Sequence, residues 1–172
     1  IKVMEELKKM EVYRQNSSYA RQHGEMAIYQ RSSVANVACR NAIEEAIRQN
    51  FDGMHLDVRG AKKVLETFGA PRVLLVLANT VQQKAWDGRF SVENRKWAQT
   101  YELPVDEELA GDRRSAYVVQ SHPAVLDGFI QQTRRLVQER ELQQNKVCLQ
   151  DKLHPAKMPI QPKKSRAAAQ ER

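Results

Sequence analysis

Histidine and cysteine are the side chains of this chain best suited to bind zinc or to serve as a nucleophile and its base. They are few and widely spaced: His23, His55, His122, His154, Cys39 and Cys148. Zinc sites show paired Cys or His ligands at short spacing, and none occurs here. The seven glycines form no glycine-rich phosphate-binding loop before a helix. The sequence therefore predicts neither a metal site nor a cofactor.

A catalytic thiol is the remaining enzymatic alternative. Cys39 would become a nucleophile if the fold brought it to His55 or His122. However, Cys39 stands among Val37 and Ala42, which is typical of a small buried apolar residue. We therefore expect a protein that is not an enzyme, and an enzyme using Cys39 is the third choice.

The stretch that begins at Asn79 turns abruptly from apolar to polar and ends in a Trp-Asp-Gly-Arg-Phe turn. One interpretation is structural, with buried amides of Asn79 and Gln83 tying down neighbouring loops, because buried amides need hydrogen-bond partners. The other is a partner-binding surface formed by Trp86, Asp87 and Arg89, because Trp and Arg are enriched at binding hot spots.

A second candidate surface combines Arg113 and Arg114 with His122. Adjacent arginines suit a phosphate or a carboxylate ligand. They suit the acidic run at 106–108 equally well, as an intramolecular pairing. Both interpretations stay open at this point.

The positive charge is concentrated near the C-terminal end. Of the net charge of +7, residues 146–172 contribute +5 through seven basic and two acidic side chains. Lys157, Lys163, Lys164 and Arg166 are candidate nucleic-acid contacts, which would bind phosphates without sequence preference. A solvated tail is the alternative, and the rest of the chain is too weakly basic to indicate a nucleic-acid binder.

The elements that would position these residues are mostly helical, in a compact domain over 1–148. We expect helices over 1–10, from 19, over 25–50, 57–68 and 71–85, from 91 through 97, and over 123–144. The expected N-caps are Asp57, Ser91 and Ser121, and the stretch Asn16-Ser17-Ser18 can cap the short helical turn that starts at Tyr19. A buried strand is the alternative for 73–77, and 115–120 is left open between a short strand and a helical turn. From 149 the proline- and lysine-rich sequence predicts a disordered basic tail.

The helix over 25–50 should bury one stripe of side chains. The stripe recurs at steps of three and four through Met26, Tyr29, Ser33, Val37, Arg40, Ile43 and Ile47. Ala38, Ala42 and Ala46 widen it.

The chain carries no apolar run of the roughly 20 residues that cross a bilayer. Residues 1–10 are charged and lack the apolar core of a signal peptide. Two distant cysteines are unlike the disulfide framework of a small secreted domain. We therefore expect a cytoplasmic protein with no membrane contact, and its long helices leave room for a homodimer.

Three stretches carry a resemblance. They are RSSVANVACRNAIE (31–44) with NFDGMHL (50–56), VLANTVQQKAWDGRFS (76–91), and SHP (121–123) with FI (129–130). Together they resemble an uncharacterised domain family found in proteins of Gram-positive conjugative elements and prophages, over roughly residues 19–140. The family has no established activity to carry onto particular residues.

The resemblance implies a protein of a phage or mobile element. As a small, basic, nearly stand-alone domain, the chain is similar in size and type to anti-CRISPR inhibitors of type II effector nucleases. We expect a non-enzymatic inhibitor that binds such a nuclease with its guide RNA in the bacterial cytoplasm. The alternative is a nucleic-acid-binding accessory protein of element transfer or replication.

Overall fold

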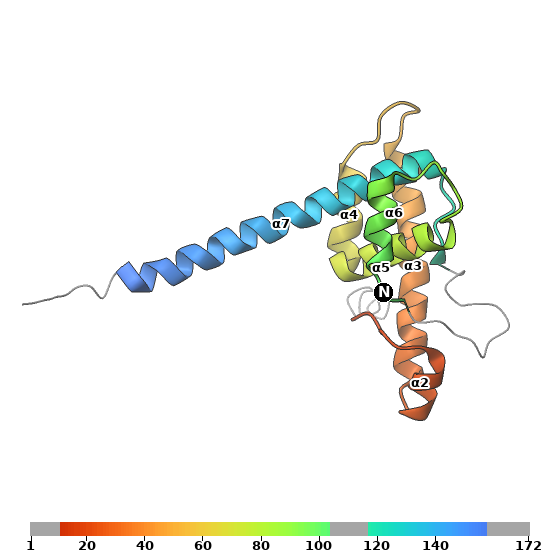
Figure 1. The fold of residues 1–172 in the computed structure, drawn as a ribbon, viewed down its shortest axis with the longest axis horizontal. Coiled ribbons are helices and arrows are strands. Elements are labelled where there is room, and N and C mark those ends of the chain that lie inside the picture. The colour runs from red at the N-terminus through yellow and green to blue at the C-terminus, as the bar shows by residue number, and fades with distance from the viewer. Residues whose placement is uncertain (1–10, 104–116, 158–172) are drawn as a thin grey trace, which may run out of the picture. The chain divides into compact units, whose positions relative to one another are not determined.

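The structure, a computed structural model, describes residues 11–103 and 117–157, with the course of the backbone alone for 147–157. Its helices are α2 (Ser17–Gln22), α3 (Met26–Asn50), α4 (Arg59–Phe68), α5 (Ala70–Gln83), α6 (Val92–Gln99) and α7 (Pro123–Lys157), as Figure 1 shows. The expected mostly α fold is confirmed, and the described ranges contain no strand. The chain divides into units 1–134 and 135–172, and the boundary falls within α7.

Several sequence expectations fall outside the described residues, namely the helix over 1–10, the arginines at 113 and 114, and the tail over 158–172. Of the segment left open between strand and turn, the described part, 117–120, forms no strand. Tyr117, Val118 and Val119 are nevertheless buried.

The end of α7 corrects the sequence prediction. The helix begins at Pro123 as expected but continues to Lys157, so residues 149–157 are helical rather than part of a disordered tail. The segment after Gln144 loses its apolar periodicity, yet half of residues 145–154 are good helix formers and no proline occurs before Pro155.

In the unit 1–134, α4 and α5 both pack against α3, and α5 also packs against α4 and α6. Residues 73–77 lie within the helix α5, which excludes the strand alternative, and the buried apolar residues of α5 are Val73, Leu75, Val76, Leu77, Ala78 and Val81. The start of α7 contributes Leu126, Phe129 and Ile130 to the same core.

Local signals set the helix ends much as the sequence predicts. The side chain of Asn16 accepts the Tyr19 N–H at 2.8 Å and caps α2. Gly69, at φ +85°, ends α4, and its N–H donates to the carbonyl of Leu65 at 2.8 Å. Pro71 lies in the first turn of α5.

The corner at Gly69 is sharp, with α4 and α5 bent by 115° relative to each other. Within the described ranges, no helix taken singly has the length and apolar character to span a membrane. The bent α4–α5 pair meets that test by length and composition alone.

The start of α4 differs slightly from expectation. Val58, rather than Asp57, occupies the cap position. The Asp57 carboxylate still accepts the Arg59 N–H at 2.9 Å and pairs with the Arg59 guanidinium at 2.7 Å.

The buried face of α3 agrees with the expected stripe at Ile43 and Ile47 but not in the middle. There Ser33 and Val37 are half-buried, and the polar residues Ser32 and Asn36 face inward instead. Polar residues occupy this part of the core because a charged side chain of α5 meets them.

That side chain is Arg72, the largest fully buried side chain among the described residues, at 1% exposed. Its guanidinium donates to the Ser32 carbonyl at 3.0 Å, to the Asn36 side-chain carbonyl, and to the Glu11 carbonyl at 3.2 Å. The Tyr13 N–H donates to the Ser32 hydroxyl at 3.0 Å. A buried charge thus joins α5 to α3 and to the segment before α2.

We predict that Arg72→Met lowers the free energy of unfolding by about 3 kcal/mol, because methionine fills the space but leaves several buried acceptors without a donor. Urea unfolding followed by circular dichroism measures this. The control is Arg48→Met, whose side chain is 69% exposed and should change stability by less than about 0.5 kcal/mol. Equal stability of Arg72→Met and the parent chain would contradict the assigned role.

Candidate functional site

The turn between α5 and α6, residues 84–90, is the first candidate site. The Asp87 N–H donates to the Lys84 carbonyl at 2.9 Å, which closes the turn. The Asp87 carboxylate accepts the Arg89 backbone N–H at 3.0 Å and two guanidinium N–H groups at 3.0 and 2.9 Å. This clamp lowers the pKa of Asp87 to about 2, chiefly through the Arg89 side chain.

The hydrogen-bonded pair of Asp87 and Arg89, here called the clamp, gives different roles to the three residues predicted as a binding surface. Asp87 is only 5% exposed and holds the turn from inside, whereas the Arg89 side chain is 54% exposed. Trp86 is 78% exposed, and Phe90 is buried beneath the turn at 1%. The turn therefore presents a large aromatic side chain on a backbone that is fixed from below.

The polar end of α5 anchors neighbouring segments. This agrees with the structural interpretation of the sequence, in which buried polar side chains hold nearby loops. Gln82 Nε2 donates to two backbone carbonyls at the end of α6, at 2.8 and 2.9 Å. Thr80 Oγ1 accepts the Val119 N–H at 3.0 Å, and Lys84 Nζ donates to the Val119 carbonyl at 3.3 Å. Thr80, Gln82 and Lys84 thus take part in this anchoring, beside the Asn79 and Gln83 of the sequence prediction.

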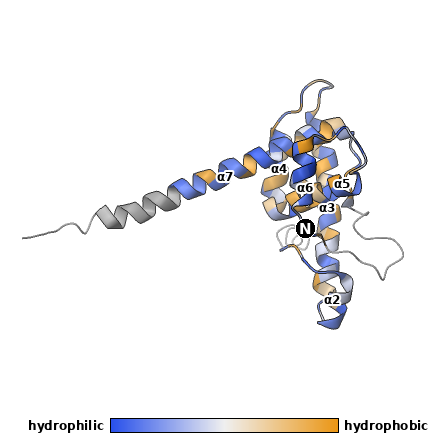
Figure 2. Cartoon of the chain, in the orientation of Figure 1, coloured by the Kyte–Doolittle hydropathy of each residue, from blue (hydrophilic) through white to orange (hydrophobic). Residues whose placement is uncertain are grey.

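Helix α6, which follows the turn, is mostly hydrophilic (Figure 2). Polar contacts therefore hold it in place. Ser91 caps it, and the Asp127 carboxylate accepts N–H groups from Ser91 and from buried Asn94, at 2.9 and 2.7 Å. Arg134 donates to Asn94 at 2.8 Å, and its guanidinium carbon lies 5.2 Å from the Trp97 ring centroid.

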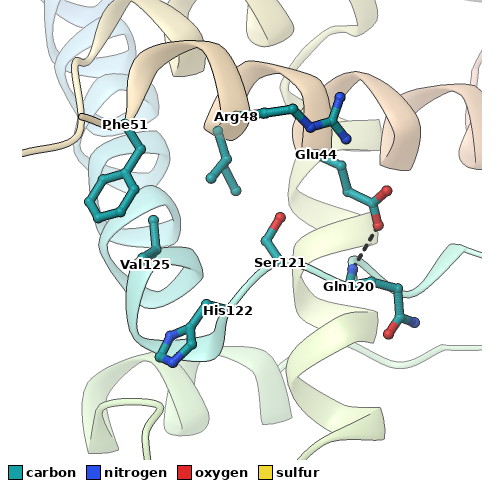
Figure 3. Close-up of a pocket in the computed structure, with 8 residues that line it drawn as sticks. Glu44, Arg48, Phe51, Gln120, Ser121, His122 and Val125 are labelled. Carbon is teal, nitrogen blue, oxygen red and sulfur yellow. Dashed lines mark hydrogen bonds between the residues drawn. The ribbon is translucent and has the colours of Figure 1, made fainter. Parts of the chain in front are cut away.

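The second candidate site is a cleft of about 360 Å³. Its lining residues are Glu44, Ile47, Arg48, Phe51, Gln120, Ser121, His122 and Val125. Figure 3 shows Phe51 and Val125 together along one side, with the Ser121 hydroxyl directed into the space between them and Glu44. Arg48 and His122 lie on opposite sides of the cleft.

Two titratable groups of this cleft, Glu44 and His122, hold the backbone in place. Glu44 accepts the Gln120 N–H at 2.7 Å and pairs with Arg40 at 3.3 Å. His122 Nδ1 accepts the Ala124 N–H at 3.2 Å, so His122, rather than Ser121 as expected, caps the first turn of α7. Among the described residues that line this cleft, no nucleophile is hydrogen-bonded to a base, and the cleft is suited to binding a small group.

The remaining predicted site residues are less well placed. Arg113, Arg114, Lys163, Lys164 and Arg166 lie outside the described residues. Lys157 is the last residue of α7, and its side chain is not described. The part of the chain that the structure describes holds no group of three or more His, Cys, Asp or Glu side chains arranged for a metal ion.

Cys39, the nucleophile of the enzymatic alternative, is fully buried in α3 at 0% exposed. Burial raises the pKa of its thiol to about 12, and the nearby Arg72 charge opposes that rise only in part. A protonated, inaccessible thiol is not suited to nucleophilic attack.

We predict that native Cys39 resists alkylation at pH 8. The variant Cys148→Ser leaves Cys39 as the only cysteine, so iodoacetamide uptake measured by mass spectrometry reports on that thiol alone. Labelling should be complete in denaturing urea and negligible, within the same time, in buffer. Rapid labelling of the folded chain would contradict the burial of Cys39.

We predict that Asp87 makes the stability of the chain depend on pH. A folded pKa of about 2, below the ordinary 3.8, means that its contribution is present above pH 3.8 and is lost as pH falls toward 2. Urea unfolding of the parent and of Asp87→Asn at pH 6, 4 and 2.5 measures it. The difference in the free energy of unfolding between the parent and the variant should shrink as the pH falls. Parallel pH profiles of the two proteins would contradict the clamp.

The fold and these sites define a helical domain that presents a clamped aromatic turn and a small cleft. The chain belongs to the DUF3849 family, a protein family of unknown function whose model matches residues 12–138. This confirms the expected membership in an uncharacterised domain family. No curated protein and no solved structure matches the chain.

Two polar centres escaped the sequence analysis. Arg72 directly precedes the apolar run of α5. That position in the sequence is a signal that its side chain is buried with the inward face of the helix. The pairing of Asn94 and Asp127 had no such signal, because the partners lie 33 residues apart in different helices.

Proposed function

We propose that this chain is a non-enzymatic inhibitor that acts by binding a protein partner through the 84–90 turn, with Trp86 at its centre. The observation that carries the proposal is the 78% exposure of Trp86 on a turn held by the Asp87–Arg89 clamp. Tryptophan is among the residues most enriched at binding hot spots, and it offers a large contact area with few rotatable bonds.

The rigidity of the turn supports binding. A side chain already held in its bound position loses less conformational entropy on association, which leaves more of the contact energy as affinity. Phe90 below the turn and the Asp87 clamp beside it supply that preorganisation. Met54 is more exposed than Trp86, at 83%, but its side chain is flexible and suits adaptable contacts.

The partner in this proposal is a guide-loaded type II effector nuclease in the bacterial cytoplasm, and the inhibitor comes from a phage or mobile element. The support for this choice of partner is the small size and basic charge of the chain, which make it similar in type to anti-CRISPR inhibitors. Arg113, Arg114 and His122 are proposed as further contacts, and the basic residues from Lys157 onward as contacts to RNA phosphates.

We predict that Trp86→Ala strongly weakens inhibition while leaving the fold intact. The assay titrates the chain into a guide-loaded type II nuclease cleaving target DNA at physiological salt. A lost hot spot of about 2 kcal/mol should raise the half-inhibitory concentration roughly thirtyfold. The matched control is Val92→Ala, another exposed apolar residue, at 56%, which should inhibit like the parent.

The urea unfolding midpoint of Trp86→Ala should equal that of the parent, because an exposed side chain contributes little to the core. No inhibition of several such nucleases by the parent chain would overturn the proposed partner. Direct DNA or RNA binding that falls steeply with salt and with removal of residues 150–172 would favour the nucleic-acid accessory role instead.

A further inference from the structure

A groove of about 740 Å³ lies between α3 and α4 and shares no residue with the 84–90 turn. Its floor consists of two rows of residues spaced by four, Ala38, Ala42 and Ala46 on α3, and Gly60, Val64 and Phe68 on α4. Residues four apart lie one above another on a helix, so each row runs along its helix axis. The floor is therefore a lengthwise apolar strip.

The size of the floor residues explains why the groove is open. Alanine has no atoms beyond Cβ, so the α3 row leaves the space above it unfilled. Gly60 lets the helices approach closely, since a Cβ there would lie 2.9 Å from Asn50 Nδ2 and 3.2 Å from the Ala46 carbonyl oxygen. The two helices thus meet tightly below while the surface between them stays hollow.

The walls of the groove are polar and follow the same spacing. One wall is Asn41, Glu45 and Gln49 on α3, and the other is Arg59, Lys63 and Thr67 on α4. Each wall row lies beside a floor row of the same helix. An apolar floor between two polar walls is the shape that accepts an amphipathic helix.

The two walls differ in charge. On the α3 wall, the charge of Glu45 is already met by the guanidinium of Arg48, and the Gln49 side chain donates to it at 2.9 Å. On the α4 wall, Arg59 is paired with Asp57, whereas the exposed Lys63 has no ion pair among the described residues. The α4 wall is therefore the electropositive one, and it favours a ligand with carboxylates on that side.

We propose that this groove binds an amphipathic helix of a partner protein. The helix carries an apolar stripe at steps of three and four, and carboxylates along the flank that faces Lys63. The floor row from Ala38 to Ala46 is about 12 Å long at the helical rise of 1.5 Å per residue, so two to three turns of the partner fill it.

The test measures fluorescence anisotropy of synthetic helical peptides titrated with the full chain. One peptide has leucines along one face and glutamates on one flank, a second has lysines in place of the glutamates, and a third has a scrambled order. The glutamate peptide should bind more tightly than the lysine peptide, by about two- to fivefold for each rim pair. The scrambled peptide should not bind.

Two variants locate the binding to the groove. Ala42→Arg fills the floor and should remove binding of the glutamate peptide. Lys63→Glu keeps the floor but reverses the wall charge, so the ratio of the two peptide affinities should shift by about tenfold toward the lysine peptide. The matched control is Lys96→Glu on α6, an exposed lysine outside the groove, which should leave the ratio unchanged.

Circular dichroism checks whether Ala42→Arg folds. If it does not, the Lys63→Glu result still tests the proposal. Failure of the glutamate peptide to bind, or equal binding of both charged peptides that Lys63→Glu does not alter, would overturn the proposal. Dimerisation in analytical ultracentrifugation that Ala42→Arg abolishes would assign the groove to a second copy instead. Peptide binding that appears only after deletion of residues 1–10 would instead assign the groove to that segment of the same chain.

Discussion

The buried guanidinium of Arg72 is the constraint around which the first unit is arranged. A charge removed from water must be met by acceptors in fixed positions, and here those acceptors are a carbonyl before α2 and the polar face of α3. This requirement explains why Ser32 and Asn36 face the core where an apolar stripe would ordinarily continue. It also sets how α5 lies against α3, and α5 in turn carries the turn that presents Trp86.

Polar contacts, rather than apolar burial alone, position the functional surface. The end of α5 anchors segments on both sides of it through Thr80, Gln82 and Lys84. Helix α6 is too hydrophilic to be held by its own apolar face, and it is secured instead through Asn94 and Asp127. Because these contacts are directional, they fix the turn between α5 and α6 more narrowly than side-chain packing would.

Much of the fold could be predicted from the sequence because local signals dominate at most helix ends. Asn16, Gly69, Pro71 and Ser91 act within a few residues of where they stand, and the apolar residues of α4 fall on one face of that helix. The end of α7 does not follow from apolar periodicity, because the periodicity stops near Gln144 whereas the helix continues to Lys157. The Arg72 and Asp127 networks join residues tens of positions apart, and no local pattern encodes such pairings.

The end of α5 holds two stretches of backbone that lie far apart in the sequence. Gln82 holds the backbone at Tyr101, and Thr80 and Lys84 hold it at Val119. Because all three side chains come from one helix and the residue directly after it, any shift of the end of α5 displaces both stretches together. A substitution that tilts this helix should therefore be felt at Tyr101 and at Val119 at the same time, although neither position neighbours it in the sequence.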